Sequence, residues 1–236
     1  MFIENKTVLI TGANGGLALS LIDQLLKKNV KKIYCTAKKA SKLENLKEFS
    51  NKIEIFTLDI TNEKQALELV SKIENIDILI NNAGVNSGKQ LFDSTQIDFE
   101  VNTFGSLNIT NILYKKINKG GAIVNITSVL ALINLPIMAL YCASKSALHS
   151  LTQALRAHAK KDSISVFEVL PGPIDTNMTK GHDMPKTSPE DVAKNILESM
   201  IKDEYEIFPD EFSKMINERL EVNKKALEDE FAMSLL

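Results

Sequence analysis

The chain has 236 residues, 44% of them apolar and 25% charged, with a formal net charge of −2, which excludes a disordered chain and argues against nucleic acid or an anionic membrane as the main partner. It contains no run of 18 apolar residues and no basic leader before an apolar stretch, so we expect neither a membrane span nor an export signal. Cys35 and Cys142 form neither a metal pattern nor a disulfide framework, so we expect a reducing, cytoplasmic environment and no bound metal.

Short β-branched runs alternate with longer amphipathic runs along almost the whole chain. This alternation predicts an α/β fold of the Rossmann type, a doubly wound parallel sheet with helices on both faces. No low-complexity linker interrupts it, so we expect one domain over residues 1–236. The predicted strands are 7–11, 32–36, 53–58, 77–80, 121–127, 163–170 and 205–208, and the predicted helices are 17–28, 42–49, 62–73, 98–118, 140–160, one that starts at Ser188, and a polar helix at the C-terminus.

Glycines follow the first predicted strand, in the segment Thr11-Gly12-Ala13-Asn14-Gly15-Gly16-Leu17-Ala18. Such a turn lets the backbone approach a pyrophosphate, and the next helix offers free amides and a positive dipole end. It is no Walker loop, because no Gly-Lys-Ser/Thr follows. A glycine-rich turn without a ligand is the other interpretation. The residues we expect at the cofactor here are Gly12, Asn14, Gly15, Gly16 and Leu17.

The second predicted strand ends in Ala37-Lys38-Lys39, and no acidic residue follows before Glu44. A carboxylate at this place would hold the adenosine ribose hydroxyls and repel a 2′-phosphate. Two ammonium groups favour NADP over NAD, with Lys38 as the main phosphate contact. A solvated lysine pair is the alternative interpretation, and NAD stays possible.

Polar and small residues also follow the next two strands. Asp59 is positioned to accept from the adenine amino group, with Ile60 against the ring, although an acid near a helix start explains Asp59 equally well. The segment Asn81-Asn82-Ala83-Gly84 offers small residues where a cofactor passes close to the backbone, so Asn82, Ala83 and Gly84 join the predicted cofactor site.

The sharpest group of residues is Ser128, Tyr141 and Lys145. Ser128 follows the fifth predicted strand, and Tyr141 and Lys145 are four residues apart on one helix, facing the same way. We expect the Lys145 ammonium to lower the pKa of the Tyr141 phenol, so that this phenol exchanges a proton with a substrate oxygen that Ser128 binds. Asn102, on the helix predicted at 98–118, is expected to hold a water that connects Lys145 to solvent.

Together these motifs resemble those of the short-chain dehydrogenase/reductase family, in its non-extended form. The resemblance implies NAD(P)-dependent hydride transfer, with Tyr141 as acid–base, Lys145 on the nicotinamide ribose and Asn102 in a proton relay. Pro171-Gly172-Pro173-Ile174-Asp175-Thr176 also matches, which implies that Pro171, Ile174 and Thr176 contact the cofactor, the last two at the nicotinamide carboxamide. Two positions depart from the pattern: Ala18 replaces the usual third glycine, and Gly15 stands where NADP users often carry a basic residue.

We therefore expect an NADP-dependent oxidoreductase for a small carbonyl or alcohol, a homodimer or homotetramer. An NAD-preferring alcohol dehydrogenase, an extended epimerase or dehydratase, and a non-catalytic NAD(P)-sensing module are the alternatives. The segment 177–186 is expected to cover the site, and the apolar segment 129–140 to line the substrate cleft. The mixed charges of 218–230 predict a solvated helix face.

Overall fold

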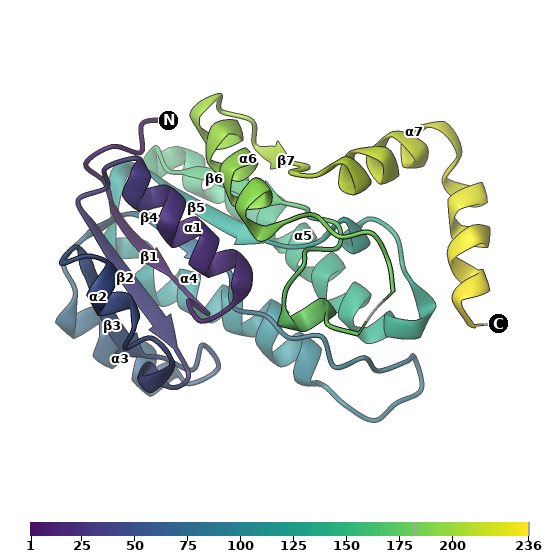
Figure 1. Ribbon diagram of the computed structural model, residues 1–236, viewed down its shortest axis with the longest axis horizontal. Coiled ribbons are helices and arrows are strands. Elements are labelled where there is room, and N and C mark those ends of the chain that lie inside the picture. The colour runs from purple at the N-terminus through teal and green to yellow at the C-terminus, as the bar shows by residue number, and fades with distance from the viewer. Residues whose placement is uncertain (182, 236) are drawn as a thin grey trace.

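A parallel sheet organises the chain, and the computed structural model describes residues 1–181 and 183–235. Within those residues the sheet has seven strands in the order β3-β2-β1-β4-β5-β6-β7 (Figure 1). The order reverses between β1 and β4, the switch point where ligands bind in open α/β sheets. The strands are β1 (Thr7–Ile10), β2 (Lys32–Ala37), β3 (Ile53–Thr57), β4 (Ile76–Asn81), β5 (Ile117–Ile126), β6 (Ser165–Val169) and β7 (Glu206–Ile207).

Helices cover both faces of the sheet because its strands are apolar on both sides. In β1, Val8 and Ile10 pack into the core beneath α1 (Gly16–Lys27) and α6 (Pro189–Ile201), and Leu9 packs into the opposite core beneath α3 (Glu63–Lys72) and α4 (Ser106–Leu113). The predicted doubly wound fold is confirmed. The helices are α1 (Gly16–Lys27), α2 (Leu46–Phe49), α3 (Glu63–Lys72), α4 (Ser106–Leu113), α5 (Ala139–Ala159), α6 (Pro189–Ile201) and α7 (Glu211–Ala232).

Local capping sets where two of these helices begin. The Asn62 side chain accepts a hydrogen bond from the Gln65 amide at the start of α3. Ser188 does the same for Asp191 at the start of α6, and Pro189 takes the first helical position. Both helix starts agree with the sequence prediction.

The helix predicted at 98–118 is wrong in its form and its end. A π-helix spans η2 (Phe99–Gly105), α4 follows, and β5 begins at Ile117 instead of 121. Ile117 pairs with Ile76, and the register then shifts before Ile78 pairs with Ala122. At Gly121 a Cβ would lie 2.5 Å from the Asp77 carbonyl oxygen. Long-range strand pairing therefore overrides the local helical pattern.

The helix predicted at 42–49 is also wrong in extent. A 3-10 turn covers η1 (Ala40–Lys42) and only the four residues of α2 are helical. Leu43 and Leu46 are both buried. Their spacing of three residues is satisfied by two separate turns as well as by one continuous helix, so burial did not require the longer element.

Three further features bear on function. Among the described residues, no helix combines the length and the apolar character that crossing a bilayer requires. In that part of the chain, no three His, Cys, Asp or Glu side chains gather to hold a metal ion. His182, within the segment expected to cover the site, lies outside the described residues.

Candidate active site

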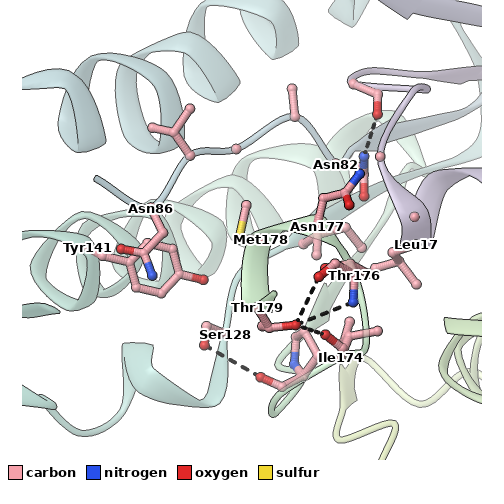
Figure 2. Close-up of a pocket in the computed structure, with 18 of the residues that line it drawn as sticks. Leu17, Asn82, Asn86, Ser128, Tyr141, Ile174, Thr176, Asn177, Met178 and Thr179 are labelled. Carbon is pink, nitrogen blue, oxygen red and sulfur yellow. Dashed lines mark hydrogen bonds between the residues drawn. The ribbon is translucent and has the colours of Figure 1, made fainter. Parts of the chain in front are cut away.

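A cavity of about 710 Å³ lies at the carboxyl ends of the strands, a size typical of sites for cofactors and drug-sized ligands. Figure 2 shows side chains from the segments that follow β4 and β5, from α5 and from the 174–179 segment converging on it. Two residues of the predicted site, Asp59 and Asn102, do not line it. The cavity brings together Gly12, Asn14, Gly15, Gly16, Leu17, Lys38, Ile60, Asn82, Ala83, Gly84, Ser128, Tyr141, Lys145, Pro171, Ile174 and Thr176.

The glycine turn after β1 is held in a shape that only glycine allows. Gly12 has φ +65°, and a Cβ there would lie 2.8 Å from the Ala83 Cα. The Asn82 side-chain amide Nδ2 donates to the carbonyl oxygens of Thr11 (3.0 Å) and Gly12 (3.2 Å). The Thr11 hydroxyl accepts from the backbone amides of Asn82 and Ala83. Asn82 therefore locks the turn against the end of β4.

The start of α1 faces the cavity without a side-chain cap. Gly15 is the N-cap residue and makes no side-chain capping hydrogen bond, so the first amides of α1 and its positive dipole end are available to an anion. At Gly16 a Cβ would lie 2.8 Å from the Thr176 Cγ2. Free backbone amides at a glycine-rich helix start that lines the cavity fit a diphosphate group.

Lysines gather at the same end of the cavity. Lys38, Lys39 and Lys42 all line it, and the Lys38 Nζ lies 3.0 Å from the Asp59 carboxylate. Burial raises the pKa of Asp59, but the Thr61 amide and hydroxyl and the Lys38 ammonium outweigh that effect and lower it below its usual value. Asp59 is thus a partner of Lys38 at the rim of the cavity. Lys42 was not singled out from the sequence.

Ser128, Tyr141 and Lys145 meet between the end of β5 and α5. Ser128 follows β5, and its hydroxyl accepts from the Leu130 amide at 3.1 Å. Lys145 is 4% exposed. Its Nζ donates to the Ile126 carbonyl oxygen at 2.8 Å and lies 5.8 Å from the centre of the Tyr141 ring. Ser128, Tyr141 and Lys145 therefore share one cavity with the glycine turn.

The expected lowering of the Tyr141 pKa by Lys145 is not what the structure has. Burial raises the pKa of Tyr141 to about 12, and the Ser128 hydroxyl acts in the opposite direction. Burial lowers the pKa of Lys145 to about 8, against the attraction of Glu168. Desolvation is the largest cause of both shifts. The Tyr141 phenol therefore keeps its proton at neutral pH in these surroundings.

Asn102 is fully buried in η2, behind the cavity wall. Its Oδ1 accepts from the Val85 amide at 2.8 Å, and its Nδ2 donates to the Val85 carbonyl and to the Ser144 hydroxyl, both at 2.9 Å. A Cβ at Gly84 would lie 3.2 Å from this Oδ1 and 3.5 Å from the Lys145 Nζ. The amide clamps the segment after β4 against α5, beside Lys145.

The sequence reading missed a buried carboxylate behind the site. Glu168 in β6 is fully buried; it accepts from the Thr127 hydroxyl at 2.8 Å, and both its oxygens lie 3.0 Å from the His149 Nδ1. Burial raises the pKa of Glu168, and His149 and Thr127 act against that rise. Thr127 precedes Ser128, and His149 is one turn beyond Lys145. The available signal was a charged residue inside an otherwise apolar strand.

The segments expected to cover and line the cleft do reach the cavity. Leu130, Leu135 and Met138 come from the apolar segment, and Met178 and Met184 from the segment after Thr176. Phe212 and Phe231 of α7 also line the cavity, and both lie outside the 218–230 segment that was predicted to be a solvated face. Their signal was weak, because single aromatic residues in a polar helix do not show which side is covered.

Comparisons with known proteins agree with this geometry. The sequence pattern of the family described as short chain dehydrogenase matches residues 6–186. A 3-oxoacyl-(acyl-carrier-protein) reductase of Rickettsia typhi is 33% identical over 74% of this chain and 75% of its own length. A 3-ketodihydrosphingosine reductase of Dictyostelium discoideum is 26% identical over 87% of this chain and 75% of its own. The crystal structure of a short chain dehydrogenase from Burkholderia cenocepacia, in complex with NADP, has 31% identity and a TM-score of 0.92 and covers 98% of this chain and 99% of that one.

Proposed function

The chain belongs to the short-chain dehydrogenase family and is an oxidoreductase of that family, and from this premise we propose that it reduces a carbonyl compound with NADPH, using Tyr141 as the acid. The observation that carries the proposal is the shared cavity of the glycine turn, Ser128, Tyr141 and Lys145. Both curated relatives are named reductases of keto compounds, which supports the direction of reduction.

Three lysines support NADP as the preferred cofactor. Lys38, Lys39 and Lys42 line the end of the cavity next to the glycine turn, and no carboxylate occurs between Ala37 and Lys42 to bind a free 2′-hydroxyl. A ribose 2′-phosphate would meet the Lys38 ammonium in competition with Asp59. The similar dehydrogenase from Burkholderia cenocepacia binds NADP.

Each catalytic side chain has a task that follows from its surroundings. Bound nicotinamide supplies the hydride to the carbonyl carbon. The Ser128 and Tyr141 hydroxyls bind the carbonyl oxygen, and Tyr141 donates the proton that completes the alcohol. The Lys145 Nζ lies 5.8 Å from the centre of the Tyr141 ring and donates a hydrogen bond to the Ile126 carbonyl oxygen. From this position its ammonium stabilises the phenolate that proton transfer leaves on Tyr141. Asn102 positions the segment next to Lys145, and a water on that side would return the proton.

The test is a panel of carbonyl compounds with NADPH and NADH in parallel. We expect reduction with NADPH, and Tyr141→Phe should lower kcat by about 10²–10⁴-fold while NADPH binding stays intact. Tyr114→Phe is the matched control, since that hydroxyl donates to Asp162 away from the cavity. Full turnover by the Tyr141 variant would overturn the assignment, and NADPH binding without any turnover would favour a sensing module.

The expectation of a homodimer or homotetramer also stays a proposal. Phe104 and Leu107 are 61% and 42% exposed on neighbouring turns of η2 and α4, which supports a second copy packing there. Light scattering of wild type and Phe104→Asp tests this: the variant should shift toward monomer, and an unchanged mass would contradict it.

A further inference from the structure

The cavity has two chemically different ends, and the second one carries information about the substrate. In Figure 2, Leu17 and Asn82 lie at one side and Tyr141 and Asn86 at the other. Many of the side chains that line the cavity from the segments around Ser128 and Tyr141 are apolar, and Asn86 beside Tyr141 is a polar exception. We call this part of the cavity the substrate end, formed by Leu130, Leu135, Met138, Met178, Met184 and Phe231.

Charge is distributed unequally between the two ends. Among the described residues that line the cavity, the charged side chains are Lys38, Lys39, Lys42 and Lys145. The first three lie beside the glycine turn, and Lys145 is bound to the Ile126 carbonyl oxygen. A carboxylate or phosphate on the far part of a substrate would thus be buried beside methionine and leucine without a charged partner, which is costly.

The last helix covers the substrate end because α7 is bent. Asn223 has φ −157° and ψ 80° within α7, and its side-chain oxygen accepts from the Ala226 amide, so it caps the second half of the helix. Arg219 and Glu230 form an ion pair across the bend. Figure 1 shows the second half, in yellow, turning sharply away from the first.

Apolar contacts hold the second half of α7 over the site. Leu227 is fully buried in a small cluster with Val129, Ile133 and Ile216, and Phe231 packs against the same cluster. The final turn, residues 233–235, contacts residues 136–138, directly before α5 and Tyr141. Phe231 therefore faces the cavity while Leu227 anchors the helix beside Ser128.

We propose that the substrate is a neutral carbonyl compound with a bulky apolar group, and that this group lies at the substrate end under Phe231. The inference rests on the proposed function. Met138, Met178 and Met184 provide an adaptable wall, and Asn86, whose amide contacts the Met138 sulfur at 3.6 Å, is a neutral polar group at the edge. Apolar surface of the substrate, rather than an ionic contact, then determines kcat/KM.

The experiment measures kcat/KM for neutral methyl ketones of increasing chain length and for the same ketones ending in a carboxylate, with NADPH saturating. Each added methylene should raise kcat/KM by about fourfold until the cavity is full, and the carboxylate should lower it by about a hundredfold. Phe231→Ala should lower the value for the longest ketone by about tenfold. Val222→Ala, on the same helix at 86% exposure, should leave it unchanged.

The outcomes separate this inference from the proposed function. Turnover without dependence on chain length, a preference for carboxylates, or equal behaviour of the Phe231 and Val222 variants overturns the substrate class alone. If no ketone is reduced, the proposed function fails, and calorimetry of ketones binding to the NADPH complex decides the rest: affinity that rises with chain length supports the apolar site, and its absence overturns it. Thermal melting of both variants checks that they fold.

Discussion

The two ends of the cavity are built in different ways. The nucleotide end consists of backbone held at close approach, with Gly12 against Ala83 and Asn82 bonded to the turn. The substrate end consists of flexible or bulky side chains from segments that follow Ser128 and Thr176 and from α7. Backbone recognition tolerates little change, whereas a surface of methionines and leucines adapts, so mutations should affect the two ends unequally.

The largest effect is expected at the glycine turn. Gly12→Val should weaken NADPH binding by at least about a hundredfold, because φ is +65° and the Cβ would collide with the Ala83 backbone. Fluorescence titration measures this. Gly120→Ala is the matched control, since its φ is +77° and a Cβ there meets nothing within 4 Å. NADPH affinity retained by the Gly12 variant would break the comparison.

The second prediction concerns Lys145, which lies between the two ends. Its folded pKa of about 8 is below the ordinary value near 10.4, so the unfolded chain binds more protons between these values and Lys145 makes stability rise with pH there. Lys145→Met lacks this rise. As the pH rises from 8 to 10.5, the free energy of unfolding of wild type should therefore increase by about 3 kcal/mol relative to that of the variant.

Denaturant unfolding of both proteins at several pH values measures this difference. Taking the difference removes the contributions of the two cysteines, whose pKa values burial raises in both proteins. A constant difference across the window would show that the Lys145 ammonium is not desolvated as the structure indicates.

The third prediction sharpens the nucleotide end. Lys38→Glu should shift the ratio of kcat/KM for NADPH over NADH toward NADH by about 10–100-fold, since a charge-assisted contact to the 2′-phosphate is lost. Asp59→Asn separates the two roles of Lys38, because it removes the ion partner and keeps the ammonium; its preference for NADPH should be unchanged or greater. An unaltered ratio in the Lys38 variant would contradict the phosphate contact.

The smallest effect is expected at the substrate end. Met178→Leu keeps the volume and the apolar character of a side chain that is 48% exposed, so kcat/KM should change by less than about tenfold. Steady-state kinetics with one neutral ketone measures this. A loss as large as that of the Gly12 variant would show that both ends are equally rigid, which would remove the distinction between them.

The positions of Ser128, Tyr141 and Lys145 in one site could be predicted from sequence because each depends on local geometry. Tyr141 and Lys145 face the same way through helical spacing, and Ser128 follows a strand in a parallel sheet, where ligands gather. Asn102 is the contrast: the sequence predicted it on an α-helix, but it lies in a π-helix, and its side-chain amide bonds Val85 and Ser144. That role depends on contacts with segments far along the chain.

By itself the sequence determined the alternation of strands and helices, the glycine turn and the grouping of Ser128, Tyr141 and Lys145. Periodicity, backbone freedom and spacing are properties of neighbouring residues. Only the tertiary structure decided the start of β5, the burial of Glu168 beside His149, the direction of the Tyr141 pKa shift and the placement of Phe231 over the cavity. These depend on desolvation and on packing between distant segments, which no local pattern encodes.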